Sequence, residues 1–76
     1  MHLVTLPGSI EIRVNPKDHR PIHVHVFDGV NAEALMELDG SIYAGTVSAK
    51  ARKAAFVWVL ANANIIDAAW KKVGNP

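Results

Sequence analysis

Hydrophobic and polar residues alternate along the first half of the chain, and this two-residue period is typical of strands that bury one face. The alternating segments are residues 10–14, 22–27, 32–38 and 41–46, with residues 3–6 offering a further short strand. Asp28-Gly29 and Asp39-Gly40 separate three of these segments, and Asp-Gly pairs favour the tight turns of β-hairpins. The pattern therefore predicts an antiparallel meander of three or four strands.

The second half of the chain changes to helical spacing. Ser48 is a favourable N-cap, because its hydroxyl can accept a hydrogen bond from a free backbone N–H of the first turn. The first helix is expected to end near residues 62–64, and Asn64 can cap a second helix that stops at Gly74. Apolar residues surround most of the first helix's second half, so the sheet and either the last helix or a partner should cover it. The inward-facing residues of the second helix are expected to be Ile65, Ile66, Ala69, Trp70 and Val73.

These elements predict a single α+β domain over residues 1–76, in which the antiparallel meander is followed by two C-terminal helices packed on one face. The hairpin at Asp28-Gly29 allows two registers. A two-residue loop pairs His25 with Ala32 and turns the histidines toward the apolar face of the next strand. A three-residue loop sets His25 opposite Glu33 and unites the apolar residues on one side. We favour the second register because it satisfies burial better.

Composition and charge narrow the classes of function. The chain has 76 residues, no cysteine and a formal net charge of +1, which is far from the balance of a dedicated nucleic-acid-binding domain. No signal peptide or membrane-spanning segment is recognisable, so we expect a cytoplasmic protein without membrane association. A P-loop, a dinucleotide fingerprint and a serine nucleophile elbow are all missing, which favours a non-enzymatic role. Cores of this size are often stabilised by a metal or a second subunit, which leaves a homodimer open.

Three of the four histidines are close together in the sequence, at positions 19, 23 and 25. Alternate residues of a strand share a face at a spacing of about 6.5–7 Å, so His23 and His25 can reach one metal ion. Imidazole and carboxylate ligands together suit zinc or another first-row metal. The further ligands to consider are Glu33, which the favoured register brings near, and Asp18, His19 and Asp28.

The same histidines are candidate catalytic residues. Because histidine titrates near neutral pH, His19, His23 and His25 can serve as general acids or bases, as in a small RNase. The competing interpretation is a plain polar strand surface. Each functional interpretation requires the imidazoles to be displayed to solvent together, and this is what we expect. Apart from the zinc alternative, no cofactor is expected.

Three cations lie at the start of the first helix, at Lys50, Arg52 and Lys53. Cations in this position oppose the helix dipole at a cost of about a few tenths of a kcal/mol each, which a bound anion offsets. With the Ser48 hydroxyl and the free N–H groups they predict a site for phosphate or carboxylate, and Arg20 adds a further cation for nucleic acid. The alternative is a solvated face that forms ion pairs with Glu33, Glu37 or Asp39.

The segment Asp18-His19-Arg20-Pro21-Ile22-His23-Val24-His25-Val26 resembles the core motif of a prokaryotic family catalogued as domain of unknown function 4160. Members of that family typically carry His-Arg-Pro-Pro-His-Val-His-Val, so Ile22 departs from the pattern by replacing the second proline. The helices here are also richer in alanine than is usual. The resemblance continues through Gly29, Ala32, Ala34, the Gly45-x-Val47 approach to the basic helix and Trp70.

The resemblance implies a small prokaryotic partner-binding protein, because family members are often encoded beside another small protein in pairs that look like toxin and antitoxin modules. We therefore expect a component of such a pair that acts on or near nucleic acid, with His19, His23 and His25 as the residues to watch. One alternative is a non-enzymatic inhibitor from a phage or mobile element that docks on a larger protein complex. The other is a metal-binding domain or small RNase that uses the His-x-His strand.

Overall fold

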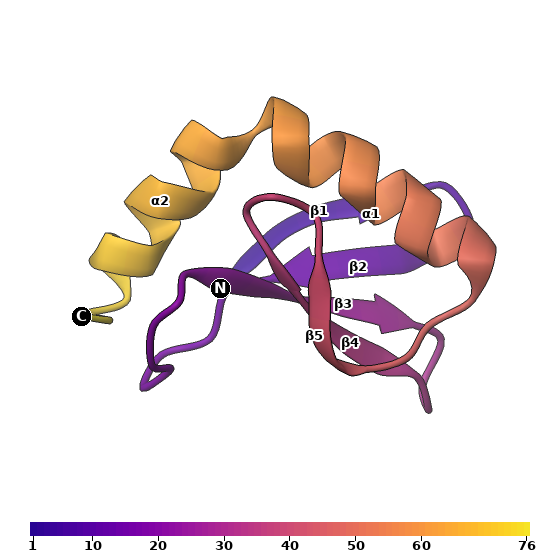
Figure 1. Cartoon of the computed structure of the whole chain (residues 1–76), viewed down its shortest axis with the longest axis horizontal. Coiled ribbons are helices and arrows are strands. Elements are labelled where there is room, and N and C mark those ends of the chain that lie inside the picture. Colours follow the sequence, from indigo (N-terminus) through magenta and orange to yellow (C-terminus); the bar gives the residue numbers. More distant parts are fainter.

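The computed structural model describes all residues, 1–76, and consists of a five-stranded sheet followed by two helices (Figure 1). The strands are β1 (His2–Leu6), β2 (Ile10–Arg13), β3 (His23–Asp28), β4 (Glu33–Glu37) and β5 (Ile42–Gly45). The helices are α1 (Ala49–Ala61) and α2 (Ala63–Lys72). The predicted α+β class is confirmed.

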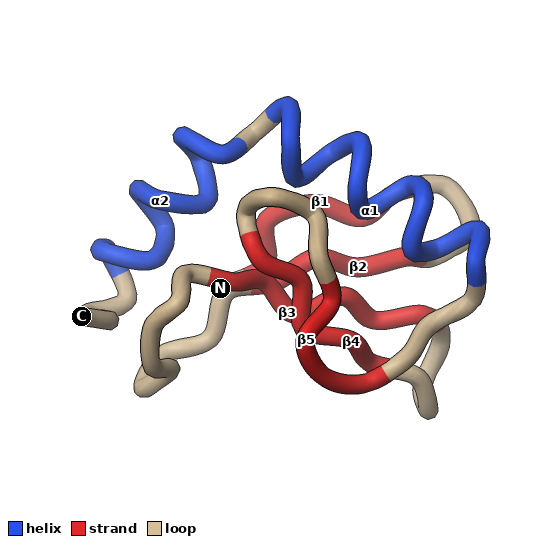
Figure 2. Tube along the Cα trace, in the orientation of Figure 1, coloured by secondary structure: helices blue, strands red, loops and turns tan.

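The sheet is a simple antiparallel meander in which each strand pairs with the next along the chain, in the order β1-β2-β3-β4-β5. It has five strands, one more than the upper limit of the prediction, because the short segments at both edges join the sheet (Figure 2). Short hairpin loops make three of the four connections, after β1, β3 and β4, whereas a longer loop of residues 14–22 joins β2 to β3.

The core lies between one face of the sheet and α1. Alternation along β2, β3 and β4 turns apolar side chains to this face, where they meet the small residues of α1. The central members of this cluster are Ile10, Ile12, Val24, Val26, Met36, Ala51, Ala55 and Val59. The alanines let the helix approach the sheet closely, and each fully buried aliphatic side chain contributes about 1.5–3 kcal/mol.

The hairpin between β3 and β4 places the predicted residues on each face of the sheet, but His25 pairs with a different residue than predicted. Residues 29–31 form a three-residue loop that is closed by a 2.9 Å hydrogen bond from Asp28 N to Ala32 O. Asp28 thus belongs to the strand and not to the turn, so His25 pairs with Leu35, and the predicted pairing with Glu33 is wrong. Both registers keep the same residues on each face, because they differ by an even number of positions.

The helix start was predicted correctly, whereas the break between the helices lies earlier than expected. Ser48 is the N-cap of α1 and its Oγ accepts a hydrogen bond of 3.1 Å from Ala51 N. Asn64 is not a cap, because α2 already begins at Ala63. Asn62 forms the junction, and its side-chain amide donates to Trp58 O at 2.8 Å. The expected burial of Ile65 is wrong, since this side chain is exposed.

Helix α2 continues past the ends of the strands and brings the C-terminus beside the loop between β2 and β3 (Figure 1). Ile66, Ala69 and Trp70 are its buried residues, and Val73 ends the helix before Gly74, as predicted. The Trp70 indole N–H donates to Pro76 O at 2.7 Å and so holds the chain end in place. Neither helix has the length and the hydrophobicity that crossing a membrane requires.

Candidate functional site

His23 and His25 lie side by side on the face of the sheet opposite α1, with ring centroids 5.4 Å apart. The prediction that they share a face is confirmed, but the prediction that they are displayed to solvent is wrong. Only 3% of His23 and 9% of His25 is exposed. Trp70 and Tyr43 cover His23 with edge-on rings whose centroids are each 5.3 Å away.

Asp18 closes this cluster from the loop between β2 and β3. Its Oδ2 lies 2.8 Å from His25 Nε2 and 3.2 Å from His23 Nε2. The loop is held by Asn75, whose side-chain Oδ1 accepts from Asp18 N at 3.2 Å and whose amide donates to Asn15 O at 2.8 Å. The C-terminal residues therefore position a carboxylate against two buried imidazoles.

The remaining ring nitrogens of the two histidines also have oxygen neighbours. His23 Nδ1 lies 2.8 Å from the carbonyl oxygen of Pro21, and His25 Nδ1 lies 2.6 Å from Glu33 Oε2. A carbonyl can only accept, so His23 must carry a hydrogen on Nδ1. Both rings are thereby fixed with Nε2 directed toward Asp18.

His23 Nε2 is a buried atom without a hydrogen-bond partner. Asp18 Oδ2 lies within ion-pair distance, yet the contact does not have the geometry of a hydrogen bond. Leaving a buried polar group unsatisfied costs about 1–3 kcal/mol. His23 Nε2 is therefore the one ring nitrogen of the cluster whose bonding capacity no atom of the chain uses.

The structure separates the residues that sequence reasoning grouped as possible ligands. Asp18, His23 and His25 each direct one ligand atom into a common space, with all three atoms within 4.8 Å of one another. Glu33 lies on the other side of the His25 ring, at Nδ1, and contributes no atom to this space. His19 is exposed and makes no contact with the cluster through its side chain.

Tyr43 borders the cluster on the side of β5. Tyr43 is nearly half exposed, and its partial desolvation, together with the charges of Asp18 and Glu37, raises the pKa of its phenol. The tyrosine therefore stays neutral and serves as an aromatic wall for His23. Neither Tyr43 nor Asn75 was singled out from the sequence, because both reach the cluster from distant segments and carry no local motif.

The N-terminus of α1, the predicted anion site, already has a carboxylate of this chain beside it. Ser48 N donates to Asp28 Oδ2 at 3.0 Å. Hydrogen bonds from Ser48 and the nearby charge of Lys50 lower the pKa of Asp28. Sequence reasoning assigned Asp28 to a turn. Its contact with Ser48 was not predicted because the two residues are twenty positions apart and no local pattern connects them.

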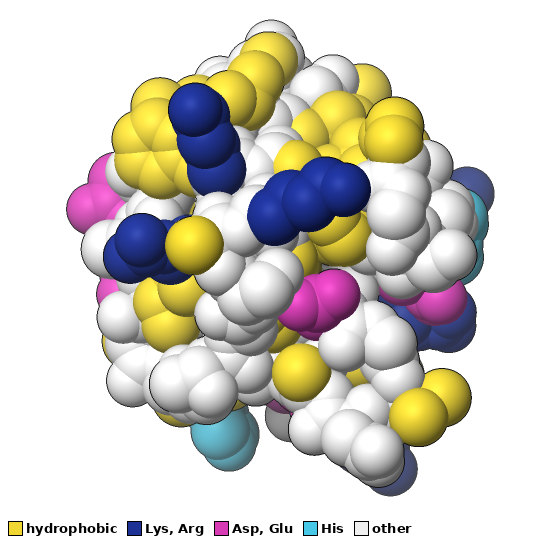
Figure 3. Space-filling model, turned by 90° about the vertical axis from the view of Figure 1, so that its right-hand side faces the viewer, with side chains coloured by type: hydrophobic (Ala, Val, Ile, Leu, Met, Phe, Trp, Pro, Cys, Tyr) yellow, Lys and Arg dark blue, Asp and Glu magenta, His cyan; other side chains and the backbone are white.

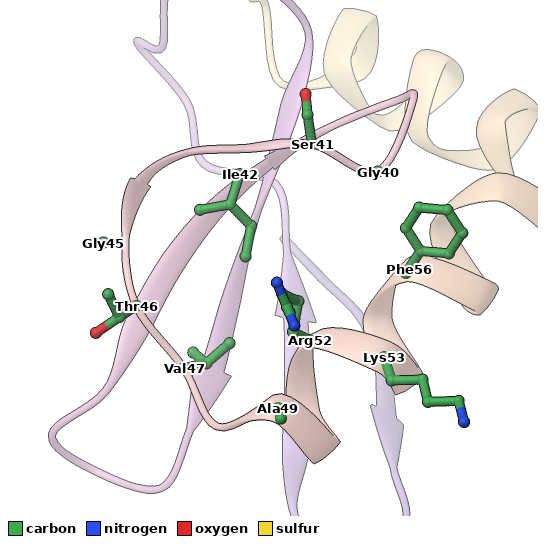
Figure 4. A pocket seen from close by; sticks show the side chains of 10 residues that line it. All are labelled: Gly40, Ser41, Ile42, Gly45, Thr46, Val47, Ala49, Arg52, Lys53 and Phe56. Carbon is green, nitrogen blue, oxygen red and sulfur yellow. The ribbon is translucent and has the colours of Figure 1, made fainter.

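The three cations of α1 have no ion-pair partner, and the alternative pairings with Glu33, Glu37 and Asp39 do not form. Arg52 and Lys53 line an open hollow of about 910 Å³ between β5 and the start of α1. Figure 4 shows Arg52 directed toward the β5 side of this hollow and Lys53 directed away from it. Arg20 belongs to the loop between β2 and β3, and Figure 1 shows this loop at the other side of the molecule from the start of α1.

The outer face of α1, which we define as Lys53, Phe56, Val57 and Leu60, combines charge with exposed apolar surface. Val57 is 63% exposed, and the two larger side chains are each nearly half exposed. Figure 3 shows lysine and arginine side chains beside apolar ones on the side of the molecule where α1 begins. A shallow apolar groove of about 530 Å³ adjoins this face, between α1 and the turn after β1.

Comparison with known proteins identifies one relationship. A family model described as Domain of unknown function (DUF4160) matches residues 10–71, which include the histidine segment, all of α1 and all but the last residue of α2. No curated protein and no solved structure matches the chain.

Proposed function

From the premise that the chain belongs to this family of unknown function, we propose that it is a partner-binding protein, one component of a toxin-antitoxin-like pair. The partner we infer is another protein, which docks an apolar segment flanked by carboxylates on the outer face of α1. The observation that carries the proposal is the exposure of Phe56, Val57 and Leu60 beside cations that have no partner in this chain.

The apolar part of the proposal follows from the cost of leaving such side chains in water. An interface buries them at its centre and gains about 25 cal/mol for each Å² of apolar surface removed from solvent. Hollows lie on both sides of the outer face, and side chains of a partner can insert into them. The other large apolar side chains that are exposed, Val30, Tyr43 and Ile65, lie on three different elements of the fold.

The charged part of the proposal selects the chemistry of the partner. Helix α1 contains Lys50, Arg52 and Lys53 and no acidic residue. Carboxylates on a partner would meet these cations at the rim of the interface, where they steer association and fix orientation. The proposal therefore commits to an acidic and apolar protein segment, for example an amphipathic helix or a short extended stretch.

Nucleic acid is the second candidate partner, because Arg52, Lys53 and the polar groups of the hollow beside β5 offer phosphate contacts. Two observations favour protein. The net charge is only +1, and the centre of the outer face is apolar. Phosphate binding alone would leave Phe56, Val57 and Leu60 in water.

The test uses the purified full chain and the product of the adjacent reading frame, with binding measured by isothermal titration calorimetry. We expect a one-to-one complex that Val57→Glu weakens by at least about tenfold, since burial of one valine is worth about 1.5 kcal/mol. Val30→Glu is the matched control, because Val30 is 97% exposed in the loop between β3 and β4, off the outer face. It should leave the affinity unchanged.

Binding of nucleic acid or of a second copy of the chain to the outer face of α1 would give different results, which would overturn the proposal. Absence of binding to the adjacent product, or equal binding by both variants, contradicts it. Fluorescence anisotropy with RNA and DNA oligonucleotides tests the second candidate, whose signature is tight binding that falls steeply with added salt. Sedimentation of the free chain as a dimer that Val57→Glu dissociates would assign the face to a second copy.

A further inference from the structure

We propose that Asp18, His23 and His25 form a binding site for one divalent first-row transition metal, with zinc as the ion that fits the donors best. This site is separate from the outer face of α1, and the inference does not rest on the proposed function. The ligand atoms are His23 Nε2, His25 Nε2 and Asp18 Oδ2.

The positions of the three ligand atoms agree with this assignment. Bonds of about 2.0–2.1 Å to a tetrahedral zinc ion place neighbouring ligand atoms roughly 3.3 Å apart. Asp18 Oδ2 lies 2.8 Å from one imidazole nitrogen and 3.2 Å from the other, and all three atoms lie within 4.8 Å of one another. An ion therefore requires only small side-chain movements.

The outer nitrogens of the two rings are held as they are in metal sites. Metal-binding histidines usually donate their second ring N–H to a carboxylate or a backbone carbonyl, which fixes the tautomer and the ring orientation. His25 Nδ1 meets the Glu33 carboxylate and His23 Nδ1 meets the Pro21 carbonyl. Glu33 thus acquires a definite role, as a positioning residue behind His25.

The unpartnered nitrogen of His23 is the independent observation that points to a ligand. His23 Nε2 is enclosed by the protein and makes no hydrogen bond, although Asp18 lies close to it. In the neutral ring, a hydrogen on Nδ1 leaves Nε2 with a lone pair directed into the space that it shares with His25 and Asp18. A metal ion accepts such a lone pair, whereas the arrangement of protein atoms alone leaves it unused.

Three protein ligands leave a fourth coordination position, which water or a side chain of a partner can occupy. The path to this position passes Asp18, whose side chain is more exposed than either imidazole. A metal also suits a small chain without cysteine, since a bound ion ties the loop between β2 and β3 to the sheet.

The first experiment prepares the full chain with chelator, removes the chelator and titrates Zn²⁺ alone by calorimetry. We expect one ion per chain and an unfolding temperature that rises by on the order of 10 °C at a hundredfold excess over Kd. Absence of binding, or binding without any change in the unfolding temperature, overturns the proposal.

Three variants assign the ligands in a graded series. Asp18→Asn should weaken zinc binding by more than about tenfold, and Glu33→Gln should weaken it by about tenfold through its effect on His25. His19→Gln is the matched control, because His19 is exposed and adjacent to Asp18 in the sequence. Loss of binding in His19→Gln with retention in Asp18→Asn overturns the assignment.

A measurement on the unaltered chain decides the question if Asp18→Asn does not fold. The ring-nitrogen NMR signals of His23 and His25 should shift at Nε2 when Zn²⁺ is added, and those of His2 and His19 should not. Unshifted signals at His23 and His25 contradict the proposal. Because Val57→Glu lies outside this site, it should bind zinc as the unaltered chain does, which separates failure of this inference from failure of the proposed function.

Discussion

The histidine cluster and the outer face of α1 are opposites in burial: the cluster encloses polar side chains, whereas the outer face exposes apolar ones. In the cluster, polar side chains are enclosed, and every ring nitrogen of the two histidines except His23 Nε2 makes a hydrogen bond. On the outer face, the apolar side chains of Phe56, Val57 and Leu60 are partly exposed and Lys53 forms no ion pair. Buried polar groups need bonding partners at defined positions, so the cluster is suited to a ligand of fixed geometry. Exposed apolar patches mark interaction sites, so the outer face is suited to a macromolecular partner.

The two regions also differ in how they are assembled. The cluster draws on β3, on the loop before it, on β5 and on the C-terminal residues, so it exists only in the complete fold. The outer face consists of consecutive turns of one helix. Substitutions in the two regions should therefore have unequal effects on stability.

The largest effect is expected for Trp70→Ala. Trp70 is fully buried, contacts His23 and anchors the chain end through Pro76 O. Loss of a buried tryptophan costs about 3–5 kcal/mol, which is a large part of the stability of a domain of this size. Val57→Ala on the outer face should change the free energy of unfolding by less than about 0.5 kcal/mol. Urea unfolding followed by circular dichroism measures the free energy of unfolding of both variants. Similar losses in the two would contradict the expected difference between the two regions.

A smaller effect, dependent on pH, is expected for Asp28→Asn at the start of α1. Ser48 and Lys50 lower the pKa of Asp28 in the folded chain, so its contribution to stability is complete above the unfolded value of about 4. The contribution is lost as the pH falls through the lowered folded value. The variant should melt below the unaltered chain at pH 7, and the difference should narrow as the pH falls below about 4. A difference that is constant over this range would show that the carboxylate charge is not its cause.

Local patterns were sufficient to predict most of the elements. Strand alternation and the Ser48 cap depend on residues near one another in the sequence, and these predictions agree with the structure. The pairing of His25 was wrong because it depends on whether Asp28 belongs to the strand or to the turn, and either choice unites the apolar face. Pattern alone does not distinguish registers that bury the same side chains.

The cluster was only partly predictable for a related reason. The His-x-His spacing placed two imidazoles on one face, but their burial depends on Trp70, which lies 45 or more positions further along the chain. The choice of Asp18 in place of Glu33 depends on Asn75, whose contacts with the loop span 57 and 60 positions. Strand geometry carries no information about either contact.

The most direct test of the account is a long-range nitrogen–proton NMR correlation spectrum of the histidine rings in the metal-free chain. The structure requires His23 to carry a hydrogen on Nδ1, opposite the Pro21 carbonyl, while its enclosed Nε2 makes no hydrogen bond. We predict a hydrogen on Nδ1 that exchanges slowly with solvent. A His23 ring with its hydrogen on Nε2, or with rapid exchange at Nδ1, would contradict the enclosed cluster from which the metal site is inferred.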